Sequence, residues 1–319
     1  MSLGALLSLL TAPAAGLAPE PRQLTLAAGP QGIPASTVLI TLGARLAQDL
    51  PGLGVRVETP AAGAAENVRI VGGNPRAVGY AGSPVVHEAA RGEGPFSGNA
   101  IPLRTLAPLW DITYHLVTIE GSGVVRLADL RGKRISAGPA NTPVSRDAMR
   151  ILVAAGIDPG RDVQVLNLAF SDLIRALEER QIDAFFYADV GVPPLPGIFR
   201  LAMSPDVRMR LIPLDSAVPV LQQTFGRSYI QATIQREHYP SLTADVPTVA
   251  GYFMLVVRVD FDAGLAYQIT RLLYTHRLEL ARVSKEAQYI SLNGVAGRSP
   301  VPFHPGAIRY FRERELPGF

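Results

Sequence analysis

The residues most able to bind a ligand lie in three short loops, each of which precedes a predicted helix. The loops span 29–36, 61–67 and 141–145. Free backbone N–H groups at a helix N-terminus, together with the helix dipole, attract carboxylates without the need for a buried cation. We therefore predict that these loops hold a small carboxylate. The candidate contacts in them are Gln31, Gly32, Ser36, Asn67, Asn141, Thr142 and Ser145.

Three more polar residues are candidates because they follow predicted strands. Ser83 directly precedes Pro84, the order in which an N-cap and a first helical residue usually occur. Tyr187 and Asp189 leave a strand through the loop at 188–191, which we expect to face the same cleft. The carboxylate of Asp189 would repel an anionic ligand unless it is turned away.

Each of these candidates also has an explanation that needs no ligand. Ordinary helix capping would explain Ser36, Asn67, Ser83 and Thr142. A solvent-exposed loop would explain Tyr187 and Asp189. His304-Pro305-Gly306 is expected to be a structural corner that starts the last helix, with His304 as its cap.

Sequence motifs for catalysis are absent from the chain. It has no Gly-x-Ser-x-Gly, no phosphate loop ending in Gly-Lys-Ser/Thr and no Gly-x-Gly-x-x-Gly. His87-Glu88 begins a zinc-protease helix pattern, but Arg91 stands where the second histidine is needed. The 5 histidines are dispersed. We therefore predict a binding protein rather than an enzyme, with no metal and no cofactor.

An alternation of strands and helices between 127 and 194 must position the later candidates. One helix starts at Thr142-Pro143, and Ser171 caps the next. This order is typical of a parallel sheet whose loops open at one edge, where α/β proteins bind ligands. The predicted strands lie at 134–137, 163–168 and 184–187.

A second unit is predicted from the segments on either side of this one. The chain is extended over 106–119, and we place the first crossing between the units at 114–117 and the second at 218–221. Other strands are expected at 24–28, 55–57, 78–80 and 248–257. Helices are expected at 36–50, near Glu66, from Ser83 and at 264–280.

Composition favours a folded protein with a substantial core. The chain has 319 residues, of which 48% are hydrophobic and 18% charged, with a net charge of +3. Its basic residues are scattered rather than clustered, so nucleic-acid binding is a poor explanation of the charge. The absence of cysteine excludes disulfides, cysteine metal sites and a bacterial lipoprotein anchor.

The N-terminal segment has part of the pattern of an export signal. Residues 3–10 are apolar and small residues follow up to Ala18, but the first basic residue is Arg22. We predict that 1–22 is the remnant of an export signal, with a loosely packed tail as the alternative. The protein is therefore expected in the periplasm, and N-terminal anchoring is left open.

Several motifs occur in the order typical of one receptor family. They are Glu66-Asn67, the run Asp129–Ile135, Ile182–Phe186 with Gly191-Val192-Pro193, Tyr239-Pro240 before Thr248-Val249, and His304–Ala307 followed by Tyr310-Phe311 and Glu313. Together they resemble TAXI-type solute receptors, the substrate-binding subunits of TRAP transporters, over roughly 23–313. The family's glycine- and serine-rich ligand loops are replaced here at 27–35 and 140–143.

The resemblance implies an α/β fold of the periplasmic-binding-protein-like type II, with two lobes joined by two crossings. The first lobe would comprise 23–115 and 220–319, and the second 116–219. It further implies a monomer that captures a small-molecule carboxylate and delivers it to TRAP transporter membrane subunits. A receptor that reports its ligand to a membrane sensor kinase is the alternative, and an enzyme on the same fold is disfavoured because no nucleophile–base pair is evident.

Overall fold

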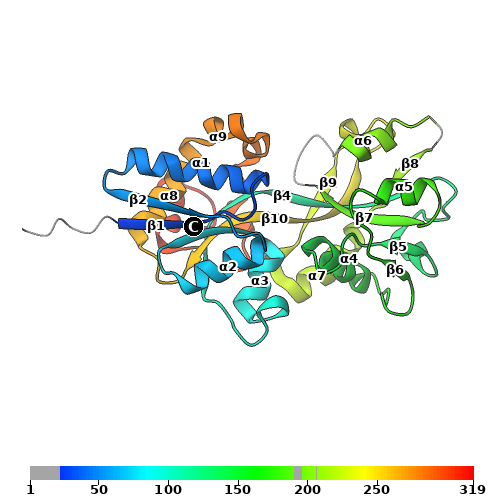
Figure 1. Cartoon of the computed structure of the whole chain (residues 1–319), viewed down its shortest axis with the longest axis horizontal. Helices are drawn as coiled ribbons and strands as arrows, with labels where there is room; N and C mark the ends of the chain where they lie inside the picture. The colour runs from blue at the N-terminus through cyan, green and yellow to red at the C-terminus, as the bar shows by residue number, and fades with distance from the viewer. Residues whose placement is uncertain (1–21, 190–195, 206) are drawn as a thin grey trace, which may run out of the picture.

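Two lobes joined by long strands make up the chain (Figure 1). The computed structural model describes residues 22–189, 196–205 and 207–319. The predicted class, α/β with two lobes, is confirmed. The predicted export segment, 1–22, lies outside the described residues except for its last position.

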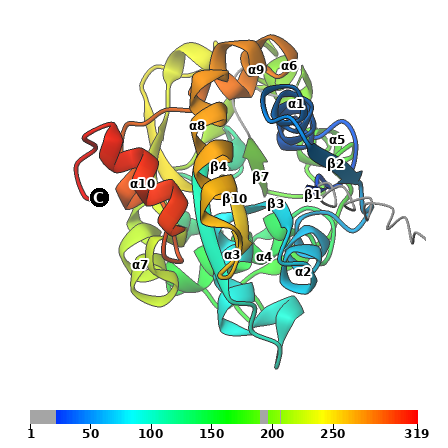
Figure 2. The ribbon, with the colours of Figure 1, turned by 90° about the vertical axis from the view of Figure 1, so that its left-hand side faces the viewer.

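The first lobe contains the N-terminal elements and the C-terminal helices. In Figure 2, the helices that follow the second crossing lie in front of the strands, beside the first helix of the chain. The bounds are β1 (Arg22–Ala27), α1 (Pro34–Asp49), β2 (Leu53–Glu58), α2 (Ala64–Gly73), β3 (Ala77–Gly82), α3 (Ser83–Arg91), η1 (Gly94–Phe96), α8 (Ala263–Thr275), α9 (Arg277–Val283), η6 (Lys285–Tyr289), η7 (Val295–Gly297) and α10 (Pro305–Glu313).

The second lobe is formed by the middle of the chain. The predicted parallel arrangement is confirmed, because its second strand pairs in parallel with the first and the first with the third. The bounds are η2 (Leu127–Leu130), β5 (Arg134–Ser136), α4 (Pro143–Ala154), β6 (Gln164–Leu166), α5 (Leu173–Glu178), β7 (Ala184–Asp189), α6 (Pro196–Ala202), β8 (Met209–Leu211), η3 (Asp215–Ala217), α7 (Val218–Phe225), η4 (Gly226–Ser228), β9 (Ile230–Ile234) and η5 (Arg236–His238).

Two long strands, β4 (Leu103–Ile119) and β10 (Val246–Arg258), connect the lobes. They pair with each other in antiparallel fashion from Leu103 to Thr113 on β4. Thr113 is opposite Ala250 of β10 on one side and Asp189 of β7 on the other. The strands described form one sheet in the order β2-β1-β3-β10-β4-β7-β5-β6, to which β8 adds beside β4 and β9 beside β10.

The second crossing differs from the predicted position. Residues 218–221 form the first turn of α7 rather than a crossing strand. Their apolar, β-branched character resembles a strand, but Pro219 occupies the start of a helix, and Val218 and Leu221 pack three residues apart into the core of the second lobe. The chain returns later, in β10.

The predicted helix at 264–280 is two helices. The chain breaks at His276, which ends α8 and precedes α9. Its ring is held from two sides, with Nε2 3.2 Å from Asp49 and Nδ1 3.1 Å from Glu279. These contacts fix the break against α1, whereas the apolar pattern of residues 264–280 continues through it.

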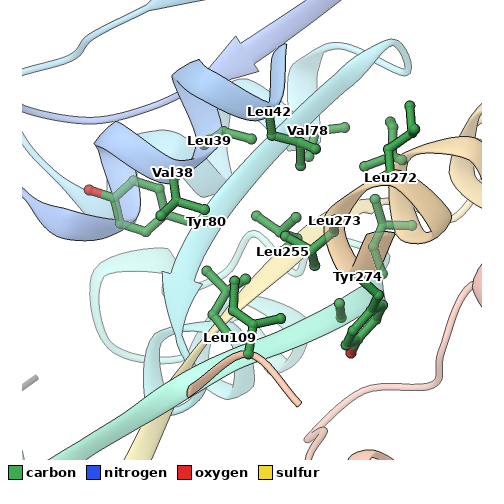
Figure 3. Packing of buried hydrophobic residues seen from close by; sticks show 14 of the residues in the cluster. Val38, Leu39, Leu42, Val78, Tyr80, Leu109, Leu255, Leu272, Leu273 and Tyr274 are labelled. Atoms are coloured by element: carbon green, nitrogen blue, oxygen red, sulfur yellow. The ribbon is translucent and has the colours of Figure 1, made fainter. Parts of the chain in front are cut away.

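Among the residues that the structure describes, four apolar clusters stabilise the lobes, two in each. The largest is enclosed by α1 and α8 over the strands of the first lobe. Figure 3 shows Val38, Leu39 and Leu42 of α1 packed toward Val78 of β3, with Leu272 of α8 on the other side. Val38, Leu39 and Leu42 stand at positions i, i+1 and i+4, so they share the apolar face of α1.

No helix in the part of the chain that the structure describes has both the length and the apolar character of a membrane span.

Candidate functional site

A cavity of about 350 Å³ lies where the lobes meet, at the point where β4 passes from one to the other. Both lobes contribute to its wall, so its shape depends on their relative position. The lining residues are Pro108, Leu109, Trp110, Asp111, Thr113, His115, Asp189, Thr233, Ile234, His238, Tyr239, Tyr289, Ser291, Asn293 and Arg298. We call this space the hinge cavity.

Strand β4 supplies three polar side chains of the cavity through its two-residue repeat. Asp111, Thr113 and His115 alternate along the strand and all line the cavity. Asp189 joins them because the end of β7 is in register with Thr113. The twofold period of the strand therefore concentrates these groups at the crossing.

An ion pair forms one wall of the hinge cavity. The guanidinium of Arg298 donates two hydrogen bonds to the carboxylate of Asp111, one of them of 3.3 Å, and both side chains are 32% exposed. Burial raises the pKa of Asp111, and the neighbouring Arg298 opposes that rise. The pair ties the segment after η7 to the crossing strand.

His115 is buried and held as a neutral ring. Its Nδ1 lies 3.0 Å from the carbonyl oxygen of Thr113, so this nitrogen carries the proton and donates. The Tyr239 hydroxyl donates to Nε2 at 2.9 Å. Burial lowers the pKa of His115 to about 4. The histidine is therefore a hydrogen-bonded part of the wall rather than a cation at neutral pH.

Trp110 presents an unpartnered donor at the border of the cavity. Its side chain is 2% exposed, and the indole Nε1 has no hydrogen-bond partner in the described residues. Its ring meets Phe253 edge-on at 6.1 Å, and Phe253 meets Tyr80 at 5.7 Å. These three rings form a row across β4, β10 and β3 on the side of the sheet that α1 covers.

A second polar group lies at the far end of this aromatic row. Asn67 is fully buried and donates from Nδ2 to the Tyr80 carbonyl oxygen at 3.1 Å, while its Oδ1 has no partner in the described residues. Gly29 adopts a φ of +64°, and a Cβ there would lie 2.8 Å from the Tyr80 hydroxyl. In Figure 3 the Tyr80 hydroxyl points away from the apolar cluster. Burial raises the pKa of Tyr80 to about 12.

The candidate site residues predicted in the first lobe differ in their exposure to solvent. Gln31 and Gly32 are exposed. Ser36 is 1% exposed with an unpartnered Oγ, and it is not the helix cap, because α1 begins after Ile33. Asn67 is not a cap either, since Gly63 holds that position.

Ser83 does not cap α3, contrary to the expectation from its position before Pro84. The N-cap is Gly82, and Ser83 lies within the helix. Its hydroxyl donates to the Ser228 carbonyl oxygen at 2.6 Å and accepts from the backbone N–H of Tyr252 at 3.1 Å. The hydroxyl is thus engaged between β10 and the second lobe.

In the second lobe, the predicted start of α4 is confirmed. Thr142 is the N-cap and accepts from the backbone N–H of Ser145 at 3.2 Å. Asn141 is exposed with a φ of 63°, the left-handed conformation that asparagine tolerates. Tyr187 contacts the His115 ring edge-on, and Asp189 lines the hinge cavity. Asp189 is thus the predicted residue that coincides with the cavity lining.

Several residues that line the hinge cavity were not predicted from the sequence. Asp111, Thr113 and His115 carried a visible signal, because polar residues recur at every second position of an otherwise apolar run. Arg298 carried no such signal, since it reaches Asp111 from 187 positions away in the chain. The corner at His304 is confirmed as the cap of α10, accepting from the Gly306 N–H at 3.2 Å.

The incomplete zinc motif has no metal-binding geometry in the structure. Among the described residues, no group of three or more His, Cys, Asp or Glu side chains is arranged to hold a metal ion. The His87 ring packs edge-on against Phe225, and Glu88 is bound by Arg150.

Comparisons with known proteins agree with this architecture. The model of the NMT1-like family matches residues 27–314. A periplasmic sulfonate-binding protein SsuA from Methylobacillus flagellatus KT has a TM-score of 0.56 and 12% identity, with 94% of this chain and 97% of that chain covered. MatC from Rhodopseudomonas palustris, with bound malate, has a TM-score of 0.51 and 13% identity, covering 92% and 98%.

A TctC solute-binding protein from Polaromonas has a TM-score of 0.51 and 12% identity, covering 83% of this chain and 87% of that one. At such identities the likeness establishes a common fold, that of periplasmic solute-binding proteins.

Proposed function

Because this chain belongs to the NMT1-like family, we propose that it is an extracytoplasmic receptor that captures a small organic anion. The observation that carries the proposal is the hinge cavity, whose walls come from both lobes. A ligand that contacts both lobes favours their closed arrangement over an open one. A receptor with this geometry couples occupancy of the cavity to the position of the lobes.

The donors around the cavity suit a carboxylate. Arg298 is already paired with Asp111, so the remaining donors are neutral groups. The buried indole N–H of Trp110 is an unpartnered donor in the described structure, and a ligand acceptor would remove the cost of leaving it so. Hydroxyl and amide donors complete the set at Thr113, Thr233, Ser291 and Asn293.

The two carboxylates of the cavity limit the number of anionic groups that a ligand can carry. Asp111 and Asp189 both line the cavity, and a dianion would be placed close to two carboxylates. We therefore favour a ligand with one carboxylate, such as a 2-oxo acid, or a glutamate-like molecule whose ammonium group offsets part of its charge. MatC, whose bound malate is a dicarboxylate, supports a carboxylate ligand on this fold but not the restriction to one carboxylate, whereas SsuA supports a sulfonate as the competing anion.

Delivery to TRAP-type membrane subunits, as for TAXI receptors, is the role we propose for the captured anion. The motifs around Glu66-Asn67, Asp129–Ile135 and His304–Ala307 support it. A periplasmic protein of the same fold, SsuA, supports export.

A ligand screen tests the proposal. The purified protein would be heated with a panel of monocarboxylates, dicarboxylates, amino acids and alkanesulfonates, and hits measured by calorimetry. A ligand at one hundred times its Kd stabilises the folded state by about 2.7 kcal/mol, which should raise Tm by several degrees. A shift confined to sulfonates or to cations would refute the carboxylate, and turnover of a bound compound would refute a receptor role.

A further inference from the structure

Glu88, the acid of the incomplete zinc motif, lies buried between the lobes on the opposite side of the sheet from the helices α1 and α9. It belongs to α3, whereas its partners belong to α4. Figure 1 shows α3 and α4 below the strands and α1 and α9 above them. Glu88 is not part of the hinge cavity.

The carboxylate of Glu88 lies between two guanidinium groups of the second lobe. Its side chain is 2% exposed, and Oε1 accepts from Nη2 of Arg150. Nε of Arg146 lies 3.6 Å from the same oxygen. A carboxylate this buried is tolerated only when it is paired, so Glu88 requires the second lobe to be in place.

The second lobe does not require Glu88 in return. Arg150 also donates to Asp147 at 2.9 Å and to the Tyr229 hydroxyl at 3.2 Å, and its guanidinium lies over the Phe225 ring. Asp147 accepts further hydrogen bonds from the hydroxyls of Tyr114 and Tyr229. If the lobes separated, Arg150 would keep these partners.

We propose that Glu88 is a latch between the lobes. It binds Arg150 when α3 and α4 are in contact and passes into water when these two helices separate, while the charge of Arg150 remains balanced by Asp147. This asymmetry makes the contact reversible. The latch sets the relative position of the lobes in the unliganded protein, whichever ligand the cavity takes.

Another polar contact of α3 with the second lobe lies beside the crossing strand β10. Ser83 bonds to Ser228 and also to Tyr252 of the crossing strand β10. Such contacts, close to the axis of motion, need not break when the lobes rotate. Glu88 lies about one and a half turns further along α3 than Ser83, where the separation of the lobes would be larger.

Spin labels on the two lobes would test the latch. The chain has no cysteine, so Ala44→Cys on α1 and Val153→Cys on α4, both exposed, can be labelled alone. In this background Glu88→Gln should add a population at longer distance and lower the closed-to-open ratio at least about ten-fold. Arg146→Gln should change the ratio in the same direction by less, because Arg146 is the more distant partner.

Glu93→Gln is the matched control. Glu93 is an exposed acid of the first lobe that pairs with Arg91 of the same lobe, and its loss should leave the distance unchanged. Unfolding monitored by circular dichroism separates opening from loss of fold. An unchanged distance distribution in folded Glu88→Gln and in Arg146→Gln would overturn the latch and leave the proposed receptor function untouched.

Discussion

His115 should make the stability of the protein depend on pH. Burial lowers its pKa from 6.5 to about 4. Below pH 6.5 the unfolded chain binds a proton at this side chain and the folded chain does not, so stability is lost as the pH falls. Over the whole window the loss is on the order of 3 kcal/mol. Urea unfolding at pH 7 and pH 4.5 measures it.

The variant His115→Gln isolates this contribution. Its unfolding free energy should be lower at pH 7 but should fall less steeply between pH 7 and 4.5 than that of the wild type. Burial also lowers the pKa values of His87 and His304, so a shallower slope remains. Equal slopes in both proteins would show that another group titrates.

Trp110 offers a direct reading of cavity occupancy, because the chain contains 1 tryptophan and it lines the cavity. A ligand that accepts from its indole N–H should change the emission wavelength or intensity. Trp110→Phe should abolish the signal while circular dichroism stays unchanged. Binding seen by calorimetry without a fluorescence change would place the ligand away from this ring.

Asn67 should contribute to folding, and its effect on affinity tests whether the ligand reaches beyond the hinge cavity. Asn67→Ala removes its buried hydrogen bond to the Tyr80 carbonyl and is expected to lower the free energy of unfolding by about 1–3 kcal/mol. If the free Oδ1 meets the ligand, affinity should fall by a similar amount. Asn99→Ala, at an exposed position, is the control and should change neither. Unchanged affinity would make Asn67 purely structural.

Local sequence patterns predicted the residues of the site only in part. Helix-start chemistry found Thr142 and His304, because capping depends on the few residues around each position. The prediction that Ser83 caps α3 was wrong, because its hydroxyl donates instead to the carbonyl oxygen of Ser228, a residue distant in the sequence. Asp111 and Arg298 meet across 187 positions, a distance at which one sequence carries no information.

At the scale of elements, the contact between α10 and α8 depends on Gly306. A Cβ there would lie 2.2 Å from the Ala263 carbonyl oxygen and 2.8 Å from the Ala266 Cβ. Gly306→Ala should therefore destabilise the protein by about 1–3 kcal/mol or more, since backbone must move. Thermal unfolding would register this as a lower Tm.

Gly297→Ala is the matched control for this substitution. Gly297 is exposed, and nothing lies within 4 Å of a Cβ built there. Its Tm should stay close to that of the wild type. If both variants melted alike, the close approach of α10 to α8 would not be a source of stability.

Elements with strong periodicity were predictable and their ends were not. The strand–helix alternation of the second lobe followed from apolar spacing, because each element buries one face. The break at His276 did not, since it depends on Asp49 of α1. The second crossing, expected at 218–221, lies elsewhere because Pro219 favours a helix start and these residues begin α7.

For the whole molecule, the two-lobed fold was predictable and the ligand was not. The order of strands and helices along the chain is compatible with only a few topologies. A sequence that shares this order with a known family is therefore expected to share its fold. The ligand depends instead on the hinge cavity, whose lining is gathered from β4, β7, β9 and the segment after η6. Among the site residues predicted from the sequence, Asp189 lines the hinge cavity.

The register of β4 and β10 at the crossing also indicates how the two lobes could be separated at the level of the gene. Thr113 and Ala250 are opposite each other on β4 and β10, and the second lobe is the single stretch of chain between them. A short turn in place of that stretch would leave β4 and β10 as an ordinary β-hairpin in the first lobe. The second lobe is thus a loop insertion in architectural terms, and a gene encoding the first lobe alone needs only one deletion.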